Sequence, residues 1–142
     1  MDKYIKSSSD YAVISKDFPL ISNLNMTENI SLIKEVQEFM SVEDAQKLAR
    51  EYLKLISYED LGNKRVNNCT EVEIFYVKFI RALFSDAQNI YISTPFVILQ
   101  SVVNMDEIIN NLLKYNSEKN IMILDLNSNE HRYKGSTCNT IR

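Results

Sequence analysis

Short apolar runs alternate with stretches of helical periodicity along these 142 residues, and this alternation limits the fold more than any other feature. Residues 11–15, 89–93 and 120–125 read as strands, and the segments between them read as helices. Strands separated by helices pair in parallel through right-handed crossovers. The sequence therefore predicts an α/β fold: a short parallel sheet of about three strands, with a helical subdomain over 27–85 inserted between strands 1 and 2.

The helices are indicated by caps and by apolar spacing. Asn25 or Thr27 can cap a first helix, and Ser41-Val-Glu-Asp44 resembles a capping box with Asp in place of Glu. After Ser41 the apolar residues form one stripe at helical spacing: Ala45, Leu48, Ala49, Tyr52, Leu53 and Ile56. Residues 71–85 are apolar nearly all round, which predicts a buried helix.

Length and composition predict one domain over 1–142, with 1–9 and 127–142 flexible. The net charge is −3 and the Lys and Arg residues are scattered, so no nucleic-acid partner is expected. No run approaches the roughly 20 apolar residues of a membrane helix, and the start lacks a secretory signal, which predicts a cytoplasmic protein without direct membrane insertion. Cys69 and Cys138 are expected to be reduced thiols.

Glycine is nearly absent, since Gly62 and Gly135 are the only two in the sequence. Loops that cradle phosphate need glycine, both for positive φ and for close approach of the backbone to the ligand. Neither GxxxxGK[ST] nor GxGxxG can occur in this sequence.

Most of the chain nevertheless resembles the ATPase domains of ABC transporters. Residues 11–30 resemble the family's glutamine loop, a strand end followed by a leucine-rich loop and a "Leu-Thr-Val-x-Glu-Asn" helix start. Residues 49–62 are similar to the following helix and turn. Residues 79–96 look like the segment from the signature helix, through Arg81-Ala-Leu-Phe, to the Walker B strand, and residues 104–126 like the last helix and the switch-histidine strand.

Every position that carries chemistry in that family is occupied by a different residue here. The loop glutamine falls on Lys16, the Walker B aspartate on Ser93 and the catalytic glutamate on Thr94. The D-loop aspartate falls on Gln100 and the switch histidine on Leu126. The glycine-containing signature falls on a run without glycine: Cys69, Thr70, Glu71, Val72 and Glu73.

These replacements define what the resemblance implies. The phosphate-binding loop would lie upstream of residue 11, where the sequence has only ten residues. Phosphoryl transfer depends on the glycine loop, its lysine and acid-held Mg²⁺. The resemblance thus implies a truncated, catalytically inactive relative without cofactor, acting as an interaction or regulatory module. The partner implied is a transporter or ATPase subunit, contacted through helices 27–56 and the turn 67–72.

The other candidate residues are expected to have structural or surface roles rather than catalytic ones. His131 is the only histidine and lies in a polar tail, so it does not indicate a catalytic triad or a zinc site. The carboxylate pairs Glu59-Asp60 and Asp106-Glu107 are expected to be solvated. Lys16 reads as a surface lysine, with anion binding as its alternative. A small-ligand binder or an enzyme with an unrelated site on the reduced scaffold remains the alternative function.

The resemblance also has a geometric consequence. In the family, the strand of the phosphate loop lies beside the switch-histidine strand. Its loss would leave strand 120–125 as an exposed edge, and this strand carries no Lys or Pro that would discourage pairing with another chain. The prediction is a homodimer, or a partner that covers this edge.

Overall fold

The structure, a computed structural model, describes residues 10–116 and 118–133. Its strands are β1 (Tyr11–Ile14), β2 (Asn89–Ser93) and β3 (Asn120–Leu124); its α-helices are α1 (Met26–Gln37), α2 (Val42–Leu55), α3 (Glu71–Phe84) and α4 (Asp106–Tyr115). Three short 3₁₀ helices lie in the connections, η1 (Glu59–Leu61), η2 (Val66–Asn68) and η3 (Pro95–Val97), and a fourth, η4 (Asn127–Tyr133), follows β3. The predicted α/β class is confirmed. Residues 1–9 and 134–142, expected to be flexible, lie outside the described residues, as does Cys138.

The strands form one sheet in the order β1-β2-β3, and both pairings are parallel. The register aligns Ile14 with Ile92 and Ile92 with Ile123. The first and third strands each end one residue earlier than predicted. In the described chain β3 is an edge strand, as the sequence indicates, and β1 is the other edge.

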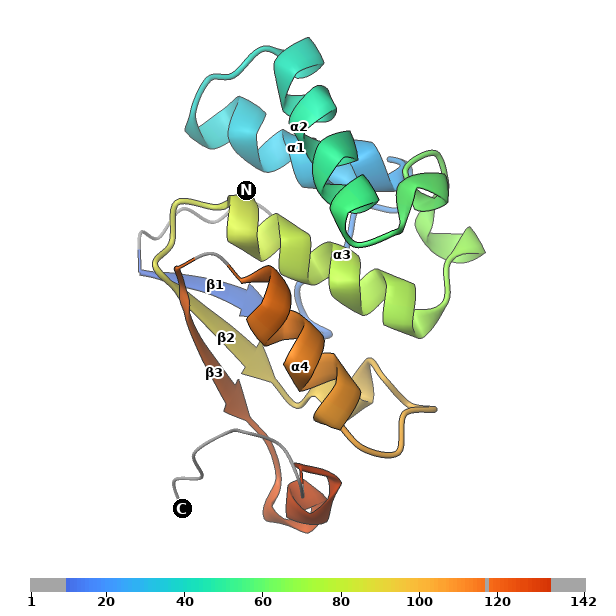
Figure 1. Cartoon of the computed structure of the whole chain (residues 1–142), viewed down its shortest axis with the longest axis vertical. Coiled ribbons are helices and arrows are strands. Elements are labelled where there is room, and N and C mark those ends of the chain that lie inside the picture. The colour runs from blue at the N-terminus through green and yellow to red at the C-terminus, as the bar shows by residue number, and fades with distance from the viewer. Residues whose placement is uncertain (1–9, 117, 134–142) are drawn as a thin grey trace.

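The two faces of the sheet differ in cover. Side chains alternate between the faces along a strand, and one face carries the buried Ile14, Ile90 and Ile92. Helices α3 and α4 lie on that side (Figure 1), as the right-handed crossovers require. The other face carries exposed apolar side chains, including Met122 and Leu124.

Helix α3 is buried almost all round, as its sequence predicts. Its apolar side chains reach the sheet on one side, and α1 and α2 pack together on its other side (Figure 1). The inserted segment 27–85 is thus divided, because α3 covers the sheet whereas only α1 and α2 stand away from it.

The helix starts are closed by side-chain caps. Asn25, rather than Thr27, is the N-cap of α1 and forms a full capping box with Glu28. Ser41 caps α2 by accepting a hydrogen bond from the backbone N–H of Asp44. Thr27 is instead buried beside Gly62, whose carbonyl oxygen accepts its backbone N–H at 3.1 Å.

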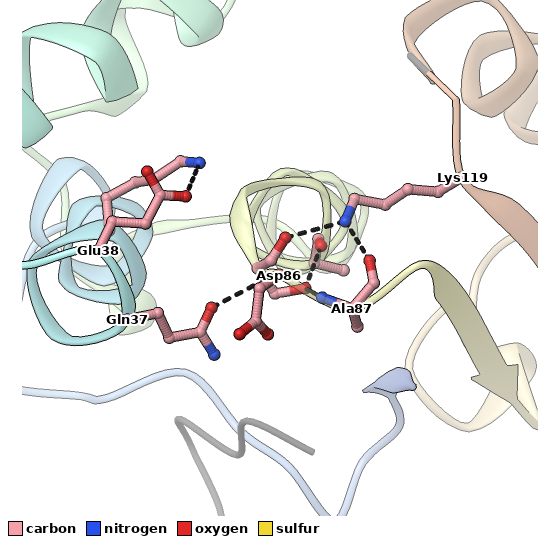
Figure 2. A network of polar contacts seen from close by, with 8 residues as sticks. Gln37, Glu38, Asp86, Ala87 and Lys119 are labelled. Atoms are coloured by element: carbon pink, nitrogen blue, oxygen red, sulfur yellow. Dashed lines mark hydrogen bonds and ion pairs between the residues drawn. The ribbon is translucent and has the colours of Figure 1, made fainter. Parts of the chain in front are cut away.

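A polar network joins three elements at the amino-terminal end of β2 (Figure 2). The ammonium group of Lys119 donates to the carbonyl oxygens of Ser85 and Ala87, and Gln37 accepts the backbone N–H of Asp86 at 2.9 Å. Burial lowers the pKa of Lys119. These bonds tie α1 and the start of β3 to the α3–β2 loop, at the pole opposite the carboxyl ends of the strands.

Residues 127–133 fold back instead of continuing as a flexible tail. They form η4, in which the Tyr133 hydroxyl donates to Asp125 at 2.6 Å and the carbonyl oxygen of Arg132 accepts the backbone N–H of Met105 at 2.8 Å. The polar composition of residues 127–133 does not predict that they fold back, because their contacts are made with residues outside this segment.

We expect the substitution Gly62→Ala to destabilise the fold. A Cβ at position 62 would meet Oγ1 of the buried Thr27 at 2.6 Å, closer than atoms can approach without a shift. Overpacking of this kind costs about 1–3 kcal/mol, measurable by urea unfolding. The double variant with Thr27→Ala removes the clashing oxygen and should recover part of the loss. A change below about 0.5 kcal/mol for Gly62→Ala, the usual range of neutral surface substitutions, would contradict this account.

Candidate functional site

The carboxyl ends of the parallel strands are where α/β folds bind ligands. Ser93 ends β2 and Thr94 follows it, while Leu126 lies shortly after β3. The backbone N–H of Thr94 donates to the carbonyl oxygen of Leu124 at 2.7 Å, which joins the two strand ends. The structure thus brings Thr94 and Leu126 together, the residues that the sequence resemblance assigns to the catalytic glutamate and the switch histidine.

A cavity of about 330 Å³ lies at this edge of the sheet. Its lining comes from the segment after β2 and from the end of β3 with η4: Thr94, Phe96, Val97, Gln100, Asp125, Leu126, Asn129 and Arg132. Three of the predicted positions, Thr94, Gln100 and Leu126, line it. Lys16, Ser93 and residues 69–73 are not among the lining residues.

Thr94 has a strained backbone, with φ 43° and ψ 62° in the left-handed region. A β-branched side chain is disfavoured there, and the following Pro95 adds a further restriction. Such strain costs on the order of 1–3 kcal/mol and is concentrated at functional sites in proteins. Here it allows the chain to turn directly from β2 into η3.

Asp125 is the only carboxylate among the lining residues, and its oxygens are already engaged. One oxygen accepts the backbone N–H of Leu126 at 2.7 Å and the side-chain amide of Asn129 at 2.9 Å. The other accepts the Tyr133 hydroxyl at 2.6 Å. This carboxylate therefore holds η4 against β3, and both of its oxygens accept hydrogen bonds from protein donors.

Arg132 brings a positive charge to the cavity wall. Its guanidinium lies 4.4 Å from the centre of the Phe96 ring, which also makes an edge contact with Tyr133. No carboxylate in residues 10–116 and 118–133 pairs with Arg132. Sequence reasoning missed Asp125 and Arg132, because a polar run at the end of the chain contains no spacing that signals a site. The nearby His131 is exposed, as expected.

The run at the family's signature position forms the start of α3. Thr70 and Glu73 make a reciprocal capping box, and Val72 packs against the core. The Glu71 carboxylate accepts hydrogen bonds from Ser101, and these bonds lower its pKa. Burial, followed by the nearby Glu73, raises the pKa of the Cys69 thiol. All five residues are thus engaged in holding this helix start and its neighbours.

Lys16 is exposed on the loop after β1, and two buried cationic side chains of α3, Lys78 and Arg81, hold this loop. The Lys78 ammonium donates to the carbonyl oxygen of Ser15 at 3.1 Å, and the Arg81 guanidinium donates to the carbonyls of Phe18 and Pro19 at 3.1 and 3.4 Å. Arg81 belongs to the run that resembles the family. In the structure Arg81 anchors this loop.

The remaining candidate groups do not form a metal or acid–base site in the described residues. No set of three or more His, Cys, Asp or Glu side chains gathers there in a metal-binding arrangement. Glu59 and Asp60 are exposed on η1, as predicted. Asp106 differs from the expectation of a solvated carboxylate, because its Oδ1 is buried without a hydrogen-bond partner.

Comparison with solved structures identifies the fold. The chain is similar to the ATP-binding cassette MJ0796 bound to ADP and Pi in a dimeric post-hydrolysis state, with a TM-score of 0.62 and 24% identity. It is also similar to a dimeric structure of MJ0796 described as a bacterial ABC transporter cassette, with a TM-score of 0.63 and 27% identity. Each match covers 85% of this chain and 54% of the other. No protein-family model and no curated protein matches the sequence.

The fold is thus that of an ATP-binding cassette, and this chain spans about half the length of the cassettes it matches. The resemblance drawn from the sequence is confirmed at this level. Ser93, Thr94, Gln100 and Leu126, which the sequence resemblance assigns to catalytic positions, lie at or near the carboxyl ends of β2 and β3 in this fold.

Lys78 should make the stability of the fold depend on pH. Burial, with a smaller contribution from Arg81, lowers the pKa of Lys78 to about 8, whereas an unfolded lysine titrates near 10.4. Between these values the unfolded chain binds more protons, so this group makes the free energy of unfolding rise with pH. Between pH 7.5 and 9.5 the rise should be about 1–2 kcal/mol.

Urea unfolding of the native chain and of Lys78→Met at several pH values in this window isolates the effect. The difference in stability between the two proteins should change with pH, because only the native chain contains the buried amine. Lys119 is present in both proteins, so its contribution to the pH dependence cancels in the difference. A difference that stays constant from pH 7.5 to 9.5 would show that Lys78 titrates normally.

Proposed function

We propose that this chain is a catalytically inactive relative of ABC ATPase domains that acts as an interaction or regulatory module. It associates with itself or with a transporter or ATPase subunit. The observation that carries the proposal is the occupancy of the cassette's catalytic positions at the end of β2, where Ser93 and Thr94 replace the carboxylate pair.

The chemistry around these positions supports the proposal. Hydroxyl groups do not offer the anionic oxygens with which proteins hold Mg²⁺ beside a phosphate. The nearest carboxylate in the cavity, Asp125, is engaged by Leu126, Asn129 and Tyr133. The sequence contains no glycine-rich loop to hold a triphosphate. Transition-state charge would therefore meet neither an acid-held Mg²⁺ ion nor a backbone cradle.

Exposed apolar residues on α1 and α2 support a contact with a partner protein. Val36, Val42 and Leu55 are exposed, and Phe39 is 90% exposed in the turn between the two helices. Phe39 has φ 54°, a conformation that glycine adopts far more easily. A large aromatic side chain held in solvent at a backbone cost is a suitable anchor for a partner. None of the described helices is long and apolar enough to span a membrane.

A small-ligand binder is the second candidate, favoured by the cavity beside Arg132. Its volume suits a small molecule, and the guanidinium stacked on Phe96 could pair with a carboxylate or phosphate group. A panel of small organic acids in a thermal-shift assay tests this function. A stabilisation present in the native chain and lost in Arg132→Gln would favour it.

The proposed inactivity predicts that nucleotides do not stabilise the protein. A ligand present at a hundred times its dissociation constant adds about 2.7 kcal/mol of stability. We expect no change in Tm with ATP or ADP in the presence of Mg²⁺, measured by thermal shift. MJ0796, which holds ADP and Pi in its solved structure, is the positive control.

A matched variant separates the loss of carboxylates from the loss of the phosphate loop. Ser93→Asp with Thr94→Glu restores the acidic pair, and we expect it to remain without ATP turnover because the glycine loop is still absent. A reproducible nucleotide-dependent rise in Tm, or ATP hydrolysis by the native chain, would overturn the proposed function.

A further inference from the structure

The cavity at the carboxyl end of the sheet lies between two segments that follow neighbouring strands. One wall is the segment 94–100 after β2, and the other is the end of β3 with η4. The bond from the backbone N–H of Thr94 to Leu124 ties the first wall to β3. The carbonyl oxygen of Arg132 accepts the backbone N–H of Met105, which ties the second wall to the start of α4. The walls are therefore held by the protein itself, and a volume of about 330 Å³ is at the small end of cavities that bind small molecules.

The guanidinium of Arg132 has hydrogen-bond donors that no group in the described part of the chain uses. Its central carbon lies 4.4 Å from the centre of the Phe96 ring. Stacking on a ring uses the flat face of a guanidinium, whereas its N–H groups lie in its plane. Among the described residues, Arg132 makes neither a side-chain hydrogen bond nor an ion pair, and it lines the cavity. A planar set of free N–H groups in this position fits a carboxylate, which can accept two parallel hydrogen bonds.

The charges of the lining favour a ligand with a single negative charge. Arg132 is the one cationic residue among the lining residues, and Asp125 is the one anionic residue. Hydrogen bonds from Leu126, Asn129 and Tyr133 hold the Asp125 carboxylate in place. One ligand carboxylate can pair with Arg132, but a second negative charge would meet Asp125 without a further cation in the lining. The cavity therefore suits a monoanion better than a phosphate group, which carries about 1.5–2 negative charges at pH 7.

The rest of the lining suits an apolar ligand body. Val97 and Leu126 line the cavity and are 42% and 63% exposed, so a ligand can remove apolar surface from water there. The two side-chain amides of the lining are already engaged. Gln100 donates to the carbonyl oxygen of Val97 at 3.3 Å, and Asn129 donates to Asp125 at 2.9 Å. Beside the guanidinium, the cavity thus offers apolar contact more than further polar recognition.

We propose that this cavity binds a small organic monocarboxylate with an apolar body. The ligand carboxylate pairs with the guanidinium of Arg132, and the apolar body covers Val97 and Leu126. Because these residues come from both walls, the bound ligand bridges η3 and η4 and stabilises the fold-back of residues 127–133. The inference rests on the second candidate function, the small-ligand binder, and names the chemical class of its ligand.

The experiment titrates the full, isotope-labelled chain with benzoate and follows the backbone amide signals by NMR. We expect saturable shifts clustered at residues 94–100 and 125–132, with a dissociation constant of about 1 mM or lower. Benzamide has the same ring without the charge, and phenyl phosphate has the same ring with about 1.5–2 negative charges. Both compounds should bind at least about tenfold more weakly than benzoate, since each loses the match of one carboxylate to one guanidinium.

Three variants test the role of the guanidinium. Arg132→Gln should raise the dissociation constant of benzoate by about tenfold or more, because a charge-assisted hydrogen bond is lost. Arg132→Lys keeps the charge but lacks the planar pair of donors, so its dissociation constant should lie between those of the native chain and Arg132→Gln. Arg50→Gln is the matched control, because Arg50 is exposed on α2, which contributes no lining residue. It should bind benzoate as the native chain does, and urea unfolding checks that each variant is folded.

The remaining outcomes each overturn the proposal. Benzoate that does not saturate the chain up to about 10 mM, or that shifts signals scattered outside the cavity, excludes the site. Equal binding of benzoate to the native chain and to Arg132→Gln excludes recognition by the guanidinium. Benzamide or phenyl phosphate bound in the cavity as tightly as benzoate excludes the monocarboxylate class but leaves the small-ligand function in place, so the two failures are distinguishable.

Discussion

The burial of α3 on all sides is the contact on which the rest of the structure depends. Phe75, Phe79 and Ile80 are almost fully buried, with the sheet on one side of the helix and α1 and α2 on the other. A helix apolar all round cannot remain in water, so both layers must assemble on it. The same helix supplies Lys78 and Arg81, which hold the β1–α1 loop by its carbonyl groups. Packing and loop position are therefore set by one element.

The cassette-like fold depends on core packing and helix caps rather than on groups that carry chemistry. The fold needs apolar positions in the core and caps at the helix starts, and these are filled: Thr70 and Glu73 form the capping box of α3. It does not need acids at the end of β2. The left-handed turn at Thr94 makes the exit from the strand abrupt, and its backbone geometry does not depend on a carboxylate at this position. A fold supports a function only through the groups placed on it.

The sequence could predict the features set by local patterns. Alternation and helical spacing located the strands and the covered helix α3, and the resemblance to the family implied that β3 is an edge strand. Features set by distant partners were missed. Asn29 is buried because its side chain bonds Ile21, Leu24 and Asn25 in the preceding loop, and nothing in its own helix indicates this. Asp125 and Arg132 enter the cavity only because η4 folds back, so no spacing along the chain indicates their proximity.

The alternation within the strands carries a further consequence. A strand covered on one side alternates apolar and polar residues, whereas a strand covered on both sides is apolar throughout. Strand β3 reads Asn-Ile-Met-Ile-Leu, with apolar residues at successive positions, and β1 reads Tyr-Ala-Val-Ile. Two strands from distant parts of the sequence thus retain the composition of a doubly covered sheet, although the described chain covers one side. Apolar residues on both sides of a strand are typical of a sheet packed on both faces, so the composition of β1 and β3 follows the fold class rather than the cover that the described residues provide.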